Sequence, residues 1–196
     1  MSGASLRRDA DLRPGPGPCP VIVTDRLHMR PYRLTDADAI AESLSDFQVT
    51  RMLTRVPAPY HRQDALDWLV PRVSGALPDW GFAITTTRDD APVGGLSIEL
   101  RHGRWHLGYW LNRFYWGRGY MSEAAAGAIE RFSRRMPESA LHSGAFADNP
   151  ASLRIQEKLG FRITGCSDMY SSARNAMATH LETVLEPQGL RAQRAA

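Results

Sequence analysis

The chain of 196 residues is poor in cysteine and has no long hydrophobic run. Its two cysteines, Cys19 and Cys166, are too few and too far apart for a disulfide framework or a zinc site, so we expect two free thiols. No apolar stretch approaches the roughly 18 residues that a membrane span requires. Residues 1–20 also lack the apolar segment of a signal peptide. We therefore expect a cytoplasmic protein with no membrane partner.

Lysine is almost absent, since 23 of the 24 basic residues are arginine and only Lys158 is lysine. The net charge of +3 points only weakly to anionic partners, because whole-chain charge governs solubility and steering rather than a site. Residues 1–20 carry +1 and residues 187–196 carry +2, so residues 21–186 are neutral as a whole. Within them, residues 101–135 hold seven arginines against two glutamates, a local +5. The arginines form no stripe interleaved with aromatics, and we expect no nucleic-acid partner.

Familiar ligand motifs are missing as well. The sequence has no Gly-Lys-Ser/Thr of a Walker loop, and no dinucleotide fingerprint of three glycines followed by an acid about 20 residues later. The histidines show no metal-ligand spacing, which predicts that the protein holds no metal. The histidines considered for such a site are His28, His61, His102, His142 and His180.

The hydrophobic pattern predicts one α/β domain, built as a three-layer α+β arrangement. We expect strands at 21–30, 80–87, 93–101, 105–111, 140–147, 161–166 and 176–185, and helices at 35–44, from about 63 to 73, at 120–136 and at 150–159. The three strands between 80 and 111 are expected to form an antiparallel meander. Pro and Gly near the start predict a flexible arm over residues 1–20, followed by the domain at 21–186 and a flexible tail at 187–196.

One segment has the form of an anion site. The strand ending at Leu111 leads into a short loop with Gly117 and Gly119, and this loop opens directly onto the helix at 120–136. The first turn of a helix presents unpaired N–H groups and the positive end of the helix dipole. Glycine permits close backbone approach to a phosphate, and Arg118 adds a positive charge. The loop alone is equally compatible with a tight turn that binds nothing.

A second segment runs from Asn149 through Pro150 and Ser152 to Leu159-Gly160-Phe161. Together the two segments resemble the GNAT acyltransferase superfamily, in particular the branch of the ribosomal-protein-alanine N-acetyltransferases, over about residues 24–186. The further marks of the resemblance are Thr24-Asp25-Arg26-Leu27 with Arg30, Val56-Pro57-Ala58-Pro59-Tyr60, Gly94-Gly95, Gly108-Tyr109-Trp110-Leu111, and Trp116-Gly117-Arg118-Gly119-Tyr120 with Glu123-Ala124.

The resemblance implies a central mixed, mostly antiparallel sheet flanked by helices and splayed between its fourth and fifth strands. It also implies acetyl-CoA as co-substrate. The residues that would bind it are Gly117, Arg118, Gly119, Tyr120, Met121 and Ser122 at the pyrophosphate, Trp110, Leu111 and Asn112 along the pantetheine, and Asn149 on the pantetheine arm. Trp116 and Met121 replace side chains common in the family's loop, so backbone groups are expected to hold the phosphate.

Catalytic candidates follow from the same resemblance. Ser152 would lie near the thioester sulfur as general acid, because Gln156 stands where many relatives have an acidic tyrosine. His106 stands where related enzymes often have a glutamate, and an imidazole titrates near neutral pH. His106, the neighbouring-strand Glu99 and a water chain stay open as the general base. Tyr109, Trp110 and Trp116 are interpreted as packing residues whose position beside the slot suits an acceptor pocket.

The sequence thus favours an N-acetyltransferase that transfers acetyl from acetyl-CoA to a primary amine by direct attack in a ternary complex. The amine would be a protein N-terminus or a small molecule, and the protein a monomer or homodimer. The alternative is a non-catalytic acyl-CoA-binding or regulatory module, indicated by Gln156 and by His106 at the glutamate position.

Overall fold

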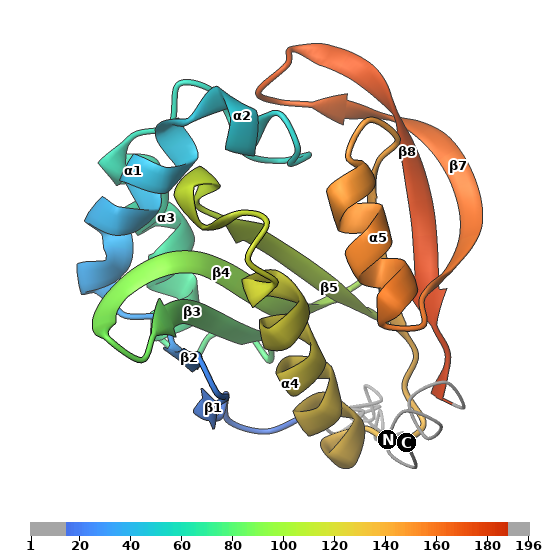
Figure 1. Cartoon of the computed structure of the whole chain (residues 1–196), viewed down its shortest axis with the longest axis horizontal. Helices are drawn as coiled ribbons and strands as arrows, with labels where there is room; N and C mark the ends of the chain where they lie inside the picture. Colours follow the sequence, from blue (N-terminus) through green and yellow to red (C-terminus); the bar gives the residue numbers. More distant parts are fainter. Residues whose placement is uncertain (1–14, 188–196) are drawn as a thin grey trace, which may run out of the picture.

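The computed structural model describes residues 15–187, which form one mixed sheet with helices on both faces (Figure 1). The eight strands lie in the order β1-β2-β3-β4-β5-β6-β8-β7. Their bounds are β1 Ile22–Val23, β2 Leu27–Pro31, β3 Trp80–Thr86, β4 Asp89–Arg101, β5 Arg104–Leu111, β6 Leu141–Phe146, β7 Arg162–Ser171 and β8 Ala176–Leu185. This arrangement confirms the expected fold class.

The sheet divides where β5 meets β6. All other neighbouring strands are antiparallel, whereas β5 and β6 are parallel and pair only at Trp105–Leu141 and His106–His142. Beyond His106 the two strands separate, and β5 has an open edge. These are the fourth and fifth strands of the sequence prediction, so the sheet splays where the resemblance implied.

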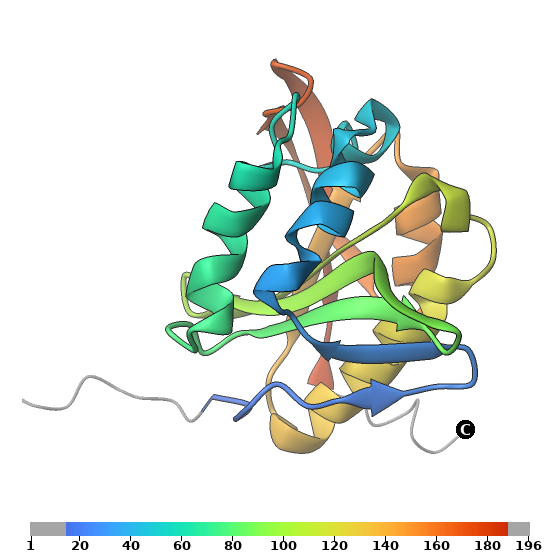
Figure 2. The ribbon, with the colours of Figure 1, turned by 90° about the vertical axis from the view of Figure 1, so that its left-hand side faces the viewer.

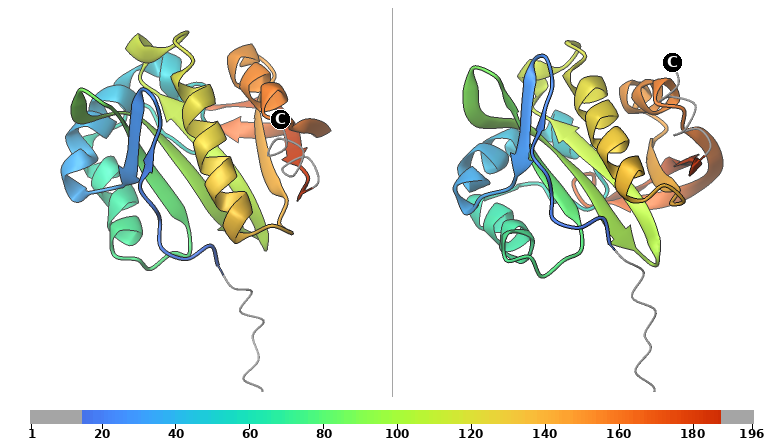
Figure 3. Two further views of the ribbon diagram at one scale, coloured as in Figure 1. Left: turned by 60° about the horizontal axis from the view of Figure 1, so that its bottom comes forward. Right: turned by 90° about the horizontal axis from the view of Figure 1, so that it is seen from below.

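Two layers of helices cover the sheet. On one face lie α1 (Ala37–Ser45), α2 (Phe47–Thr50) and α3 (Arg62–Val73), and on the other lie α4 (Tyr120–Arg135) and α5 (Pro150–Lys158) (Figure 2). Figure 3 shows α4 in front of the sheet, crossing the face that it covers. Two 3₁₀ turns, η1 (Leu34–Asp36) and η2 (Arg113–Tyr115), precede α1 and follow β5. No helix within residues 15–187 is both long and apolar enough to cross a membrane.

Each layer has its own hydrophobic core. The apolar side of α4 packs on the sheet through residues such as Ala125, Ile129 and Phe132, and the ring of Phe132 contacts Trp80 and Trp105. A second core joins α1 and α3 to the sheet; it contains Tyr32, Ile40, Leu44, Ala65, Leu69 and Ala83. The helical spacing of its apolar residues is what allowed the sequence to predict α4.

The prediction of one continuous strand at 21–30 is wrong. This segment is a small hairpin, β1 and β2, because Thr24 turns the chain: its Oγ1 accepts a hydrogen bond from the N–H of Leu27 at 3.1 Å. The short α2 was not predicted, and β7 extends to Ser171 rather than ending at 166.

Most of the expected N-terminal arm and all of the tail but Pro187 lie outside the described residues. The last residues of that arm contact the domain. The indole N–H of Trp80 donates to the carbonyl of Gly17 at 2.8 Å, and the thiol of Cys19 donates to the carbonyl of Gly81 at 3.5 Å. The division into arm, domain and tail stays a prediction.

Candidate active site

The loop before α4 has the backbone geometry of an anion cradle. Gly117 and Gly119 have φ of 73° and 76°, in the left-handed region that glycine adopts without strain. Gly119 is the N-cap of α4 and carries no side chain to cap the helix. The amides of Tyr120, Met121 and Ser122 therefore have no partner inside the helix. These residues line a cavity, so their N–H groups can bind an anion there.

This loop is held in place by Thr24 and Arg26, from the turn between β1 and β2. The guanidinium of Arg26 donates to Glu123 on α4 at 2.6 Å and to the carbonyl of Arg118 at 2.8 Å. Thr24 Oγ1 donates to the same carboxylate at 2.5 Å. Burial alone would raise the pKa of Glu123, but the hydrogen bonds from Thr24 and Arg26 outweigh it and lower the pKa. These contacts give a structural reason for two of the sequence marks, Thr24–Leu27 and Glu123.

The open edge of β5 follows from its hydrogen-bond register. The N–H of Asn112 donates to the carbonyl of Val93. Since paired residues of an antiparallel ladder alternate, the backbone groups of Trp110 and Asn112 face β4, and those of Tyr109 and Leu111 face the open edge. The Leu111 carbonyl there accepts from the indole of Trp116 at 2.7 Å. Of the three residues proposed to pair with pantetheine, only Leu111 therefore presents backbone groups at that edge, and Tyr109 joins it.

The side chains of Trp110 and Asn112 have other roles. Trp110 packs on the α1/α3 side, against Gly95, where a Cβ would lie 2.6 Å from its Nε1. Asn112 accepts from the N–H of Phe114 and donates to the hydroxyl of Ser43 at 3.0 Å. These contacts fix the end of β5 and the turn that leads to the loop.

Asn149 and Ser152 lie at the start of α5, beside the cavity. The Asn149 side-chain oxygen caps the helix by accepting from the N–H of Ser152 at 3.2 Å. Within residues 15–187 no hydrogen bond from the Asn149 amide nitrogen is recorded, so this donor is available to a ligand in the cavity. Asparagine is a favoured N-cap, which explains its place before Pro150.

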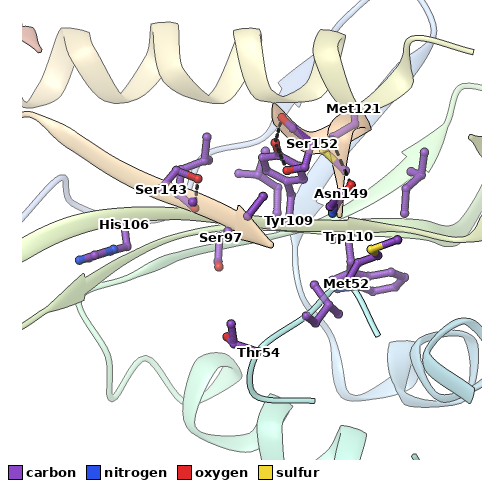
Figure 4. Close-up of a pocket in the computed structure, with 18 of the residues that line it drawn as sticks. Met52, Thr54, Ser97, His106, Tyr109, Trp110, Met121, Ser143, Asn149 and Ser152 are labelled. Carbon is purple, nitrogen blue, oxygen red and sulfur yellow. Dashed lines mark hydrogen bonds between the residues drawn. The ribbon is translucent and has the colours of Figure 1, made fainter. Parts of the chain in front are cut away.

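Ser152 belongs to a hydrogen-bonded group that reaches across to β5. Its hydroxyl lies 2.9 Å from the hydroxyl of Tyr109 (Figure 4). The buried Gln156 amide nitrogen lies 3.2 Å from Ser152 Oγ, 3.4 Å from the Tyr109 hydroxyl and 3.2 Å from the Gly144 carbonyl, and its two N–H hydrogens are shared among these three acceptors. Thr183 donates to the Gln156 amide oxygen at 2.6 Å. Gln156 thus holds the two hydroxyls in place.

Tyr109 is the functional candidate that the sequence interpretation missed, since it was read as a packing residue. Burial raises the pKa of its hydroxyl, against smaller opposing effects of the hydrogen bonds with Ser152 and Gln156. The hydroxyl therefore keeps its proton at neutral pH. The available signal was its strand parity: Tyr109 points to the opposite face from His106, and that face is covered by α4 and α5.

The opposite face of β5 carries a charged cluster centred on Glu99. Its carboxylate accepts from Ser97 at 2.8 Å and forms ion pairs with Arg55, Arg72 and Arg101. Burial alone would raise the pKa of Glu99, but the charge and hydrogen bonds of Arg101, with help from Ser97 and Arg55, lower the pKa to about 2. The Glu99 carboxylate is therefore ionised and already paired with three arginines and Ser97.

His106 lies on the same face, directly opposite Glu99 in the β4–β5 register. Burial, followed by the positive charge of Arg101 and the neighbouring His142, lowers the pKa of His106 to about 4. Its ring lies 5.4 Å from that of His142, centroid to centroid. His106 is thus neutral near pH 7, and it is not on the face that carries Ser152.

A single cavity of about 1740 Å³ is lined by residues of both faces, including the loop before α4, Ser152, His106 and Glu99. Figure 4 shows Tyr109 and Ser152 on one side of β5, and Ser97, Trp110 and Thr54 on the other. The cavity therefore connects the two faces at the splay. No group of three or more His, Cys, Asp or Glu side chains suited to a metal ion occurs in the described part of the chain.

Comparisons with known proteins agree with this geometry. Residues 26–162 match the acetyltransferase (GNAT) domain family. The uncharacterized N-acetyltransferase p20 of Bacillus licheniformis is 26% identical over 161 residues, which cover 80% of this chain and 90% of that protein.

Among solved structures, the ribosomal-protein-S5-alanine acetyltransferase of Vibrio fischeri superposes with a TM-score of 0.72 at 18% identity, covering 85% of this chain and 96% of its own. A ribosomal L7/L12 α-N-protein acetyltransferase in complex with coenzyme A superposes with a TM-score of 0.73 at 15% identity, covering 85% of this chain and 98% of its own. At these identities the two structures show a shared fold.

Proposed function

Since this chain belongs to the acetyltransferase (GNAT) family and is an acetyltransferase, we propose that it transfers acetyl from acetyl-CoA to a primary amine by direct attack in a ternary complex. The observation that carries the proposal is the cavity that crosses the splay between β5 and β6. It joins an anion cradle and a pair of hydroxyls on one face to the charged part of the same cavity on the other. Two substrates can therefore meet there without a covalent enzyme intermediate.

The cofactor face supplies binding groups for acetyl-CoA, whose thioester provides the activated acetyl group. The amides of Tyr120–Ser122 and the left-handed Gly117 and Gly119 suit a pyrophosphate. Tyr109 and Leu111 offer backbone groups along the open edge, and Asn149 offers its amide nitrogen. Arg118 adds charge beside the loop, where its guanidinium lies 5.6 Å from the ring of Tyr115.

Ser152 is the proposed proton donor to the departing sulfur. Gln156 can only donate from its nitrogen, so both hydroxyls near it keep a proton to give. When Tyr109 donates to Ser152 Oγ, the serine proton is free to point into the cavity. Tyr109 then stabilises the negative charge that forms on the serine oxygen as its proton leaves.

The amine must lose a proton during attack. Glu99 does not suit this task, because its carboxylate is held by three arginines and has a pKa of about 2. His106 is neutral and lines the cavity, so it can accept the proton directly or through water. We propose His106 or a water chain beside it as the acceptor of this proton.

The test is an assay of CoA release from acetyl-CoA over peptide N-termini, amino acids and polyamines, with the mass of each product measured. We expect the product of at least one primary amine to have the mass of its N-acetyl derivative, and we expect saturating acetyl-CoA to raise the melting temperature. A thermal shift without acceleration by any amine would instead support an acyl-CoA-binding module. No thermal shift would contradict both functions.

A further inference from the structure

Three arginines converge on one carboxylate in the cavity. Arg55 and Arg72 each lie 3.1 Å from a Glu99 oxygen, and Arg101 lies 2.5 Å from one. All four residues line the cavity on the face opposite Ser152. One carboxylate neutralises one guanidinium, so this cluster carries an excess of two positive charges.

The three arginines differ in their exposure and in the number of hydrogen bonds that they already form within the protein. Arg72 donates to the carbonyl of Trp68 at 2.9 Å, stacks on the same indole at 4.0 Å and leaves only 13% of its side chain exposed. Arg55 leaves 63% of its side chain exposed, and its one recorded hydrogen bond within the described residues is to Glu99. Arg101 is one-third exposed. Arg72 therefore supports the cluster, and its one unpaired nitrogen, Nε, is buried, whereas Arg55 and Arg101 have donors left in positions that a ligand can reach.

The excess charge lies close to the point of transfer. Arg101 Nη2 is 3.9 Å from the position that a Cβ would take at Gly108, in the middle of β5. The next residue is Tyr109, whose hydroxyl contacts Ser152 on the other face. A ligand that lies on this side of Gly108 is therefore next to Arg101.

Other carboxylates lower this charge, but within residues 15–187 none of them forms an ion pair with Arg55 or Arg101. Glu182 and Glu186 line the cavity, and Asp79 lies close enough to Arg101 for the arginine to lower its pKa, against the larger effect of burial. Asp64 and Asp67 also line the cavity, from the first turns of α3. Asp64 accepts from the N–H of His61 at 2.7 Å, and the exposed Asp67 accepts from the side chain of Gln63 at 2.8 Å. These hydrogen bonds come from neutral donors, so both carboxylates keep their charge, but they leave the guanidiniums of Arg55 and Arg101 unpaired with them.

We propose that Arg55 and Arg101 form a carboxylate-binding subsite, so that the acceptor is a primary amine that also carries a carboxylate. Guanidinium groups bind carboxylates with strong, oriented hydrogen bonds. The same positive charge disfavours a protonated amine and repels polyamines. The carboxylate is either the α-carboxylate of an amino acid or an acidic side chain near a peptide N-terminus. The inference rests on the proposed amine acetylation, which it deepens.

The test measures binding separately from turnover. Protein saturated with CoA is titrated calorimetrically with alanine against alaninamide, and with Ala-Asp-Phe-amide against Ala-Asn-Phe-amide. Loss of one charge-assisted contact predicts about tenfold or more tighter binding of the carboxylate member in at least one pair. The first pair reports an amino-acid acceptor and the second a peptide. Equal affinities within both pairs, or no binding of any of the four, would overturn the inference.

Substitutions of single arginines test which side chains cause the preference for the carboxylate. Arg55→Gln removes a guanidinium while Arg72 and Arg101 still hold Glu99, and it should reduce the preference about tenfold. Arg55→Lys should restore part of it. Arg62→Gln is the matched control, because Arg62 pairs with Asp38 outside the cavity lining and should leave the preference unchanged. A preference that survives in both Arg55→Gln and Arg101→Gln would count against the subsite.

The same compounds distinguish the two proposals. A carboxylate preference in binding, with no acetylation of any amine, would contradict the proposed reaction and leave the subsite standing. Acetylation that proceeds equally well with alaninamide, Ala-Asn-Phe-amide or spermidine would support the reaction and refute the subsite.

Discussion

The two faces of β5 offer different kinds of chemical groups to a ligand. On the α4/α5 face, the proposed binding groups are backbone amides, two left-handed glycines and a helix cap, all within two short stretches of sequence. On the α1/α3 face, they are charged side chains brought together from the loop before α3, from α3 itself and from β4. A face made of local backbone geometry suits one constant ligand, whereas a face made of distant side chains can change its specificity by single substitutions.

The largest expected effect comes from breaking the backbone cradle. Gly119→Val places a β-branched residue at φ 76°, which costs roughly 1–3 kcal/mol and adds bulk where the anion would bind. We expect the variant to lose the rise in melting temperature that acetyl-CoA produces in the parent protein. Differential scanning fluorimetry with and without acetyl-CoA measures it.

The matched control is Gly103→Val. Gly103 has φ 75°, so the strain is the same, but it lies in the turn between β4 and β5 and outside the cavity lining. Its variant should be destabilised by a similar amount and still respond to acetyl-CoA. If both variants lost the response equally, the loop before α4 would not be the cofactor cradle.

The second prediction concerns the paired hydroxyls on the cofactor face. Ser152→Ala should lower kcat about 100-fold with little change in acetyl-CoA affinity, because a positioned proton donor contributes about that much. Tyr109→Phe should lower it by a similar or smaller factor. The two hydroxyls act as a unit, so the double variant should be hardly slower than Ser152→Ala alone. Fully additive losses in steady-state kinetics would show that they act separately.

The third prediction addresses the charged face through acid stability. The pKa of Glu99 is about 2 in the folded protein against an ordinary value of 4.5. As the pH falls below 4.5 the unfolded chain takes up the proton first, so stability present above that pH is lost down to about pH 2. The loss should reach about 2–3 kcal/mol, because one pKa unit corresponds to about 1.4 kcal/mol.

Glu99→Gln should be less stable at pH 7 and should show a shallower loss of stability on acidification. Urea unfolding between pH 2 and pH 7 measures both quantities. Asp38→Asn is a suitable comparison, because Asp38 pairs with Arg62 on the exposed surface and such pairs contribute little. Equal acid profiles for the parent and Glu99→Gln would contradict the assigned role of the cluster.

The contrast between the faces also explains which features the sequence could predict. The loop at Gly117 to Ser122 and the cap at Asn149 are readable because a turn, a helix start and their residue types are local. The splay came from the family resemblance. The structure gathers the loop, Asn149 and Ser152 around the same cavity.

The features that escaped sequence analysis depend on contacts between distant segments. Tyr109 and Ser152 are 43 residues apart and meet only because α5 packs over the open edge of β5. Glu99 meets Arg55 across 44 residues, through a loop with no periodic signal. The hairpin at β1 and β2 was misread because Thr24 makes a side-chain turn that strand alternation does not reveal.

The smallest expected effect belongs to His106, the catalytic candidate on the charged face. Its pKa of about 4 means that it stays neutral from about pH 5 upward, so its own titration should not appear in the pH dependence of kcat/KM above that pH. The profile should instead rise with deprotonation of the acceptor amine.

His106→Gln should lower kcat less than about tenfold, because water can carry the proton in its place. Kinetics from pH 5.5 to pH 9.5 test this, with His102→Gln, on the turn between β4 and β5, as the control. A rise with an apparent pKa near 6.5 that disappears in His106→Gln would show instead that the imidazole of the free enzyme titrates as the general base, and that burial and the positive charge of Arg101 do not lower its pKa.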